Sequence, residues 1–235
     1  CSSDLSSFAE YMLVHEHALV KIRPDMPLDR AALIGCAVTT GVGAVTNTAQ
    51  VEVGATIAVI GCGGIGLSAI NGAAISGAGR IIAIDLNDSK LDTARTFGAT
   101  DTINAATTEP VEAIREMTGG GVAYSFEAIG RKQTTEQAFR MLATGGTATV
   151  IGMVPEGEMV EIEAADLIND KTLRGSNMGS NRFRVDMPNY VDFYLDGRLK
   201  LDAMISRRIG LEDVNDAFAE MKRGEFARSV ITFDG

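Results

Sequence analysis

The sequence has no tryptophan, five prolines and three cysteines among 235 residues. Cys1, Cys36 and Cys62 allow at most one disulfide, so a disulfide-rich secreted fold is excluded and a reducing compartment, the cytoplasm, is expected. Positive charge is also scarce: the 31 Asp and Glu residues outnumber the 21 Lys and Arg residues, and the net charge is −10. Such a surface repels a phosphate backbone, so nucleic acid is excluded as the expected partner.

One uncharged stretch, residues 53–79, is long enough to suggest a membrane span. Eight of its 27 positions are glycine, whereas a membrane helix is dominated by large apolar side chains. We therefore expect a strand, a turn and a helix here, and no membrane partner. The opening residues lack the features of a signal peptide, and a start at Cys1 suggests an interior part of a longer protein.

From about residue 50, short β-branched runs alternate with helical patterns, which predicts βαβ units and a parallel sheet. Six strands in the order 3-2-1-4-5-6 would make an α/β, doubly wound fold of the Rossmann type, with its ligand at the carboxyl ends of strands one and four. The expected strands are 56–60, 80–84, 100–103, 122–126, 147–151 and 172–178. The expected helices are 65–76, 89–97 with Asn87 or Asp88 as cap, one opened by Thr108 and Pro110 and ended by Gly119, and 133–143.

The flanks do not follow this pattern. Residues 8–22 alternate like an antiparallel strand pair that carries His15 and His17, and 181–235 predicts helices at 187–196 and 211–222 and a last strand at 229–233. We therefore expect a nucleotide-binding domain over 37–180, with 1–36 and 181–235 as parts of a second domain.

The segment Gly61-Cys-Gly63-Gly-Ile-Gly66 follows the first strand and opens a helix, as a dinucleotide-binding motif requires. Gly61 would make the tight turn, Gly63 would let the backbone approach a pyrophosphate, and Gly66 would let helix and strand pack closely. Asp85 ends the second strand, where an acid binds an adenosine ribose and repels a 2′-phosphate. The pattern predicts NAD rather than NADP, while an S-adenosylmethionine site remains an alternative from these residues alone.

Three segments together resemble the zinc-containing alcohol dehydrogenase family of medium-chain dehydrogenases: Gly35-Cys36-Ala-Val-Thr-Thr40-Gly41-Val-Gly43, the glycine motif, and Ile82-Ala-Ile-Asp85-Leu-Asn87. The segments Tyr124 to Arg131 and Phe226 to Phe233 resemble the family as well. The resemblance implies that Cys36 is one of three protein ligands of a catalytic zinc and that Thr40 lies near the nicotinamide. It also implies that the flanks belong to a GroES-like catalytic domain. Taken alone, an isolated cysteine is more often a small core residue.

The resemblance further implies a set of cofactor-binding residues. Lys90 would bind the ribose beside Asp85, Arg131 would lie beside the adenosine and Arg228 on the pyrophosphate, although a lone basic side chain is as often solvated surface. Apolar positions would line the nicotinamide or be ordinary core. The full implied set is Gly61, Gly63, Gly64, Ile65, Gly66, Asp85, Lys90, Ile129, Arg131, Met153, Met178 and Arg228.

The chain departs from the family in lacking its amino-terminal portion and with it the other zinc ligands, so one thiolate leaves the zinc site incomplete. The implied function is hydride transfer between a small alcohol or aldehyde and NAD, with zinc as Lewis acid and with the 235 residues alone inactive. Two alternatives remain: an NAD-binding module without catalysis, or a zinc-independent reductase of the same superfamily. Pairing through the strand at 172–178 predicts a homodimer or a dimer-built tetramer.

Overall fold

The computed structural model describes residues 8–223 and 228–233. The chain divides into two compact units, which we describe separately. One unit is continuous, from Cys36 to Asn181. The other combines the residues up to Gly35 with those from Arg182 onward.

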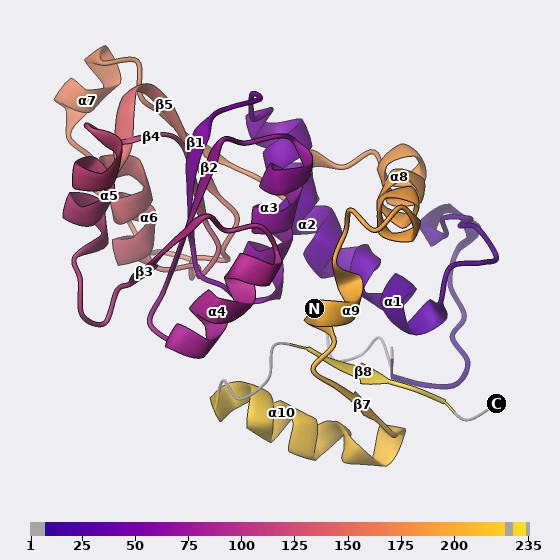
Figure 1. The fold of residues 1–235 in the computed structure, drawn as a ribbon. Coiled ribbons are helices and arrows are strands. Elements are labelled where there is room, and N and C mark those ends of the chain that lie inside the picture. Colours follow the sequence, from indigo (N-terminus) through magenta and orange to yellow (C-terminus); the bar gives the residue numbers. More distant parts are fainter. Residues whose placement is uncertain (1–7, 224–227, 234–235) are drawn as a thin grey trace. The chain divides into compact units, whose positions relative to one another are not determined.

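The continuous unit is built on a six-stranded parallel sheet, which confirms the doubly wound α/β prediction (Figure 1). The strand order is β3-β2-β1-β4-β5-β6. Because the chain runs outward in one direction through β2 and β3 and in the other through β4 to β6, the order reverses between β1 and β4. The strands are β1 (Thr56–Ile60), β2 (Arg80–Asp85), β3 (Asp101–Asn104), β4 (Val122–Glu127), β5 (Leu142–Val150) and β6 (Thr172–Gly175).

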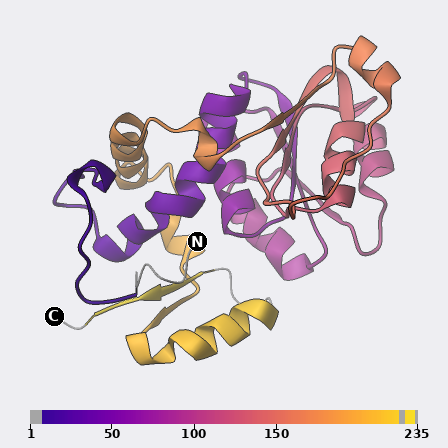
Figure 2. The same cartoon turned by 180° about the vertical axis from the view of Figure 1, so that it is seen from behind.

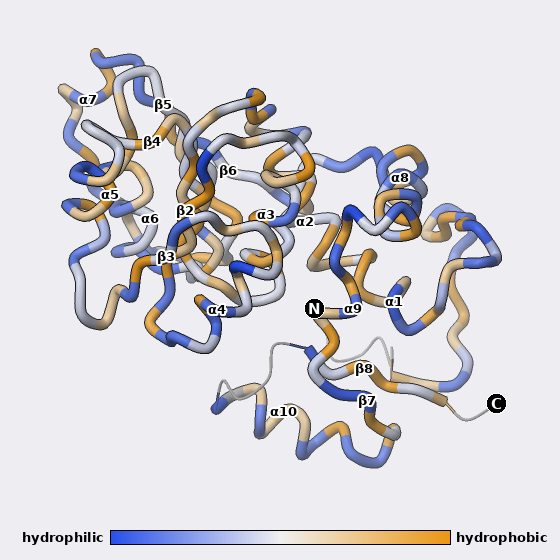
Figure 3. Tube along the Cα trace, in the orientation of Figure 1, coloured by the Kyte–Doolittle hydropathy of each residue, from blue (hydrophilic) through white to orange (hydrophobic). Residues whose placement is uncertain are grey.

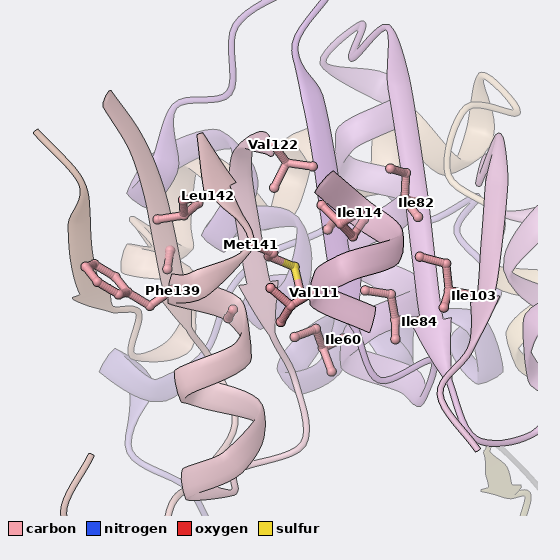
Figure 4. Packing of buried hydrophobic residues seen from close by; sticks show 13 residues of the cluster. Ile60, Ile82, Ile84, Ile103, Val111, Ile114, Val122, Phe139, Met141 and Leu142 are labelled. Atoms are coloured by element: carbon pink, nitrogen blue, oxygen red, sulfur yellow. The ribbon is translucent and has the colours of Figure 1, made fainter. Parts of the chain in front are cut away.

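Helices cover both faces of this sheet, with α5 and α6 on one face and α3 and α4 on the other, and α2 packs against α3 (Figures 1 and 2). A buried cluster under α5 and α6 joins Ile60, Ile82 and Ile114 to Phe139 and Leu142 (Figure 4). Burial of such side chains is the main stabilising contribution to the unit. The helices are α2 (Thr39–Gly43), α3 (Gly64–Ile75), α4 (Asp88–Thr96), α5 (Pro110–Thr118), α6 (Lys132–Arg140) and α7 (Ala164–Ile168).

Local signals account for most helix ends. Asn87 caps α4, as predicted, through its side-chain oxygen, which accepts from the Ser89 N–H at 2.9 Å. The predicted start of α5 is wrong by one residue: Glu109 rather than Thr108 is the cap, and its carboxylate accepts from two backbone N–H groups. Pro110 occupies the first turn, where its missing N–H costs nothing, and Gly119 ends the helix at φ +72°.

A long helical segment before β1 was not predicted. It comprises α1 (Leu28–Leu33), a π-helical stretch (Ile34–Val38), α2, and a second π-helical stretch (Ala44–Ala49). In α2, Gly41 lies so close to α3 that a Cβ there would collide with the Ile65 carbonyl oxygen. This segment is the one described helix long and apolar enough to cross a membrane, but 61% of its most apolar stretch is buried in the protein, and core helices pass the same test.

The second unit holds α1, α8 (Phe183–Leu195), α9 (Leu201–Met204), α10 (Val214–Arg223) and the parallel pair β7 (Arg207–Ile209) and β8 (Ser229–Ile231). Along α10, hydrophobic and hydrophilic residues alternate (Figure 3). The Asp29 carboxylate joins α1 to β7, because it forms ion pairs with Arg30 and Arg208, each at 2.7 Å. These guanidinium groups, Arg30 first, lower the pKa of Asp29 to about 2.

Several sequence expectations are wrong. Residues 8–22 form no strand pair; they contain a 3₁₀ turn (Glu16–Ala18), and the His15 ring accepts from the His17 N–H, because no described strand pairs with this segment to fix an extended backbone. The strand expected at 172–178 stops at Gly175, which is paired with Val150, the last residue of the neighbouring strand β5. Positive φ angles then turn the chain at residues 178 to 180. β5 begins earlier than predicted, α6 ends at Arg140 rather than 143, α8 begins at Phe183 rather than 187, and β8 ends at Ile231.

Candidate functional site

The site lies where the strand order reverses, at the carboxyl ends of β1 and β4. Glu127, the last residue of β4, is in register with Ile60, the last residue of β1. The next residues hold the two ends together, because the Ala128 N–H donates to the Ile60 carbonyl at 2.9 Å. In open α/β sheets ligands bind in the crevice at this reversal.

The glycine turn after β1 has the three properties that the motif requires. Gly61 has φ +96°, which glycine adopts without strain, and its N–H donates to the Ile84 carbonyl at 2.8 Å. A Cβ on Gly66 would collide with the Gly61 carbonyl oxygen, so only glycine fits there. Gly63 is exposed and has no atom within 4 Å of a built Cβ, so the backbone is open to an approaching group.

The amino end of α3 is suited to an anion. Gly63 is the N-cap and offers no side chain to satisfy the first N–H groups, and the first turn contains no acidic residue. Unsatisfied N–H groups and the helix dipole favour a phosphate at such an end. Gly64 is buried there, and Ile65 is half-buried.

Asp85 stands beside the glycine turn rather than at a distance from it. Its Oδ2 accepts from the Cys62 N–H at 2.8 Å, and its Oδ1 accepts from the N–H groups of Leu86 and Asn87 at 2.8 and 3.2 Å. The carboxylate therefore joins the ends of β1 and β2. Burial, followed by the charge of Asp85, raises the pKa of the Cys62 thiol to about 12, so this cysteine stays protonated and unreactive.

Two loops from the other half of the sheet meet beside the turn. A Cβ on Gly61 would lie 2.7 Å from Ile129 Cγ1, so the Ile129 side chain lies against the turn. Gly130, at φ +86°, packs directly on the Met153 backbone, and a Cβ there would lie 2.7 Å from the Met153 carbonyl carbon. Met153 is 92% exposed. The structure thus brings Ile129 and Met153 to the same edge as Gly61.

Thr40 and Met178 are also in contact. The Thr40 hydroxyl donates to Met178 Sδ at 3.7 Å, and Thr40 is buried. Met178, Gly179 and Ser180 have φ angles of +49°, +65° and +49°, a left-handed turn that is uncommon outside glycine. Asn181 holds this turn to α2, because its side-chain N–H groups donate to the carbonyls of Thr39 and Met178 at 2.7 and 2.6 Å.

The three basic residues of the predicted set lie on different elements. Lys90 is half-buried on α4, and Arg131 is the exposed N-cap of α6. Arg228 belongs to the other unit, where its N–H donates to Ser206 Oγ at 3.4 Å, so its role at a pyrophosphate stays a prediction. Residues 224–227, which include Phe226, lie outside the described part of the chain.

Cys36 is exposed and lies in the first π-helical stretch. Among the described residues, no group of three or more His, Cys, Asp or Glu side chains could hold a metal ion. A zinc site needs three or four such ligands in one place. The described residues therefore do not fit a zinc ion, and Cys36 could supply at most one ligand.

Comparison with known proteins identifies the family. The sequence profile of the zinc-binding dehydrogenases matches residues 64–196, more than half of the chain. This chain belongs to the zinc-binding dehydrogenase family. The family match also decides against the S-adenosylmethionine alternative.

Its relatives include alcohol dehydrogenase class-3 of Cereibacter sphaeroides, 39% identical over 97% of this chain and 63% of that protein. The S-(hydroxymethyl)glutathione dehydrogenase of Paracoccus denitrificans is also 39% identical, with the same coverage. Among solved structures, an alcohol dehydrogenase zinc-binding domain protein from Burkholderia ambifaria has a TM-score of 0.89 at 34% identity, covering 92% of this chain and 58% of that one. Benzyl alcohol dehydrogenase from Acinetobacter calcoaceticus has a TM-score of 0.88 at 31% identity, covering 92% and 59%. The chain thus spans about 60% of the length of the relatives it matches.

Sequence reasoning missed Glu127 and Asn181. A signal for Glu127 was present: it ends β4 just as Asp85 ends β2, and an acid that follows buried strand residues needs partners. Asn181 offered no such signal, because its partner Thr39 is 142 residues away in the chain.

Proposed function

We propose that the edge formed by Gly61, Gly63 and Asp85 binds NAD, and that the whole protein transfers hydride between a small alcohol or aldehyde and this cofactor. The observation that carries the proposal is the open backbone at Gly63, on the amino end of a twelve-residue helix without first-turn acids, next to the Asp85 carboxylate. The family match and the alcohol dehydrogenases among the relatives support the reaction class.

Each group of residues has a distinct part in this proposal. The first N–H groups of α3 bind the pyrophosphate, since they have no intrahelical partners. Asp85 is already fixed by three backbone donors, so its remaining lone pairs are oriented to accept from ribose hydroxyls. Ile129, Met153 and Met178 line the nicotinamide half, with Lys90 and Arg131 on the adenosine half. The bound nicotinamide supplies the carbon that accepts or releases hydride.

The described residues lack a set of ligands that could hold zinc. Cys36 is proposed as one ligand of a site that other residues complete, with Thr40 near the reacting groups. The same observation favours a second candidate function, an NAD-binding module or zinc-independent reductase. Zinc analysis of the whole protein separates the two candidates. Bound zinc that is lost in Cys36→Ser would support the zinc-dependent enzyme, and absence of zinc would support the second candidate.

We further propose a homodimer, or a tetramer built from dimers, that pairs through β6, and a cytoplasmic location. In support, β6 is the last strand of the sheet, and three of its four residues are exposed. An exposed strand edge with unpaired backbone groups favours pairing with a second copy. Analytical sedimentation of the protein at roughly tens of micromolar should show a dimer or a larger oligomer. A monomer at this concentration would contradict the proposal.

Calorimetric titration of the 235-residue chain tests the cofactor directly. We expect NAD to bind and S-adenosylmethionine to give no heat, because the pyrophosphate supplies much of the interaction with α3. Binding of S-adenosylmethionine alone, or of neither compound, would refute the assignment.

A further inference from the structure

The turn formed by Met178, Gly179 and Ser180, the 178–180 turn, has a strained backbone. All three residues have positive φ angles, and Met178 and Ser180 carry side chains at φ +49°. A side chain makes this left-handed backbone unfavourable, so consecutive residues adopt it only where their surroundings hold them. Strained backbone of this kind clusters at ligand-binding and active sites. The 178–180 turn therefore needs both a structural and a functional explanation.

The Asn181 side chain supplies the structural explanation. Its Nδ2 donates to the carbonyl oxygens of Thr39, on α2, and Met178, at 2.7 and 2.6 Å. The same Nδ2 lies against two glycines, because a Cβ on Gly43 would lie 2.5 Å from it and a Cβ on Gly179 2.7 Å from it. A larger residue at either position would displace the amide. Asn181 thus joins the start of the turn to α2 through a closely fitted contact.

Two further side chains support the same turn. The Asn47 side-chain N–H donates to the Gly179 carbonyl at 3.3 Å. The Ser180 hydroxyl lies 2.8 Å from the hydroxyl of Thr48, which is buried. Every residue of the 178–180 turn is therefore bonded, directly or through Asn181, to the helical segment that precedes β1.

The turn follows the carboxyl end of β6, at the same edge of the sheet as the glycine motif. There the Ser176 N–H donates to the carbonyl of Val150, the last residue of β5. The α2 helix that holds the turn also packs on the first turn of α3, where Gly41 meets Ile65. Asp85 marks the adenosine half on β2, so a dinucleotide bound across the reversal extends its nicotinamide half towards the side of β4 to β6 that carries the turn.

We propose that Asn181 is a positioning residue, which keeps the 178–180 turn in the conformation that contacts the nicotinamide half of NAD. The inference rests on the proposed function, because it requires the dinucleotide to bind at this edge. Without the two hydrogen bonds of Asn181, the strained turn would relax towards ordinary backbone angles, and its groups would no longer be preorganised for the ring. The loss should therefore fall on the nicotinamide half of the ligand and spare the adenosine half.

The test is titration of the 235-residue chain with NADH and with ADP-ribose, which lacks the nicotinamide ring. Asn181→Ala removes both hydrogen bonds. It should weaken NADH binding about 3- to 10-fold, the effect of one or two lost hydrogen bonds, and leave ADP-ribose within about twofold. The fluorescence emission of bound NADH should also move towards that of free NADH, because the ring is held less firmly away from water. Asn169→Ala, at an exposed asparagine that ends α7, is the matched control and should change neither affinity.

A second substitution separates the holding of a strained turn from an ordinary structural contact. Glycine adopts a positive φ without strain, so Ser180→Gly should restore most of the NADH affinity when it is combined with Asn181→Ala. If Asn181→Ala does not fold, Asn181→Asp gives the same comparison, because it is isosteric but cannot donate to the two carbonyls.

Equal weakening of NADH and ADP-ribose by the Asn181 variant would show a structural role only, and no change in either would show that the turn does not need the amide. Either result, or the absence of rescue by Ser180→Gly, overturns the inference. If the unaltered chain binds neither ligand, the proposed function itself fails.

Discussion

At the residue scale, two acids at corresponding strand ends have different surroundings. Asp85, the last residue of β2, is half-buried and bonds three backbone N–H groups with both of its oxygens. Glu127, the last residue of β4, is fully buried and bonds three donors with one oxygen only. The first therefore has lone pairs available at the surface, whereas the second holds the loop between β4 and α6 through its hydrogen bonds.

Asp85→Asn should reduce the discrimination between NAD and NADP. We expect the unaltered chain to prefer NAD by more than about tenfold, because the carboxylate bonds ribose hydroxyls and repels a 2′-phosphate. The amide keeps one acceptor for the Cys62 N–H but removes the charge, so the two dissociation constants should approach each other. Titration with both cofactors measures this.

Asp88→Asn is the control, since Asp88 is exposed and bonds the Asn104 side chain. It should leave the preference unchanged. An unaltered NAD preference in Asp85→Asn would remove Asp85 from the assignment.

At the scale of elements, the glycines of the turn between β1 and α3 serve different purposes. Gly66→Ala should destabilise the protein by about 2 kcal/mol or more, because its Cβ would collide with the Gly61 carbonyl. Gly63→Ala has open space, so it should cost at most about 1 kcal/mol, the usual penalty at an N-cap. It should nevertheless weaken NAD binding at least about tenfold by blocking the backbone approach.

Urea unfolding and NAD titration of both variants separate the two effects. Gly54→Ala is not a suitable control because φ is +82° there, so Gly175→Ala, with open space and no positive φ, serves instead. Normal NAD affinity in a folded Gly63→Ala variant would refute the pyrophosphate placement.

The ion pair between β2 and β3 should make stability depend on pH. Arg80 bonds both oxygens of Asp101 at 2.9 Å and, with the Thr100 hydroxyl, lowers the pKa of Asp101 from 3.8 to about 2. Because the folded pKa is below the unfolded one, the stabilisation is complete above about pH 4 and is lost as the pH falls towards 2. Asp101→Asn should therefore cost about 1–2 kcal/mol at pH 7 and progressively less below pH 4.

Urea unfolding at pH 7, 4 and 3 measures the difference. Asp92→Asn, an exposed position on α4, should show no comparable change. A cost for Asp101→Asn that did not fall with pH would mean that the contact does not act through charge.

At the scale of the whole molecule, the 235-residue chain should bind NAD but hold no stoichiometric zinc and show no alcohol oxidation. A usable zinc site needs several preoriented ligands and their supporting partners, and Cys36 is one exposed thiol. Metal analysis and an NADH-formation assay should both give background values. One zinc per chain that is lost in Cys36→Ser would contradict this prediction.

Local sequence patterns were sufficient to predict the sheet, its strand order and the glycine turn, because β-branched runs, caps and glycines act over a few residues and right-handed crossovers then restrict the topology. These patterns did not predict the helical segment 28–49, the early end of β6 or the irregular backbone of residues 8–22, since these depend on neighbours distant in the chain. Only the tertiary structure brought Asn181 to Thr39 and Met178 to Thr40, and showed that Oε2 of Glu127 is buried without a described donor. Burial and pairing of a polar atom are decided by what packs around it, and no local pattern records that.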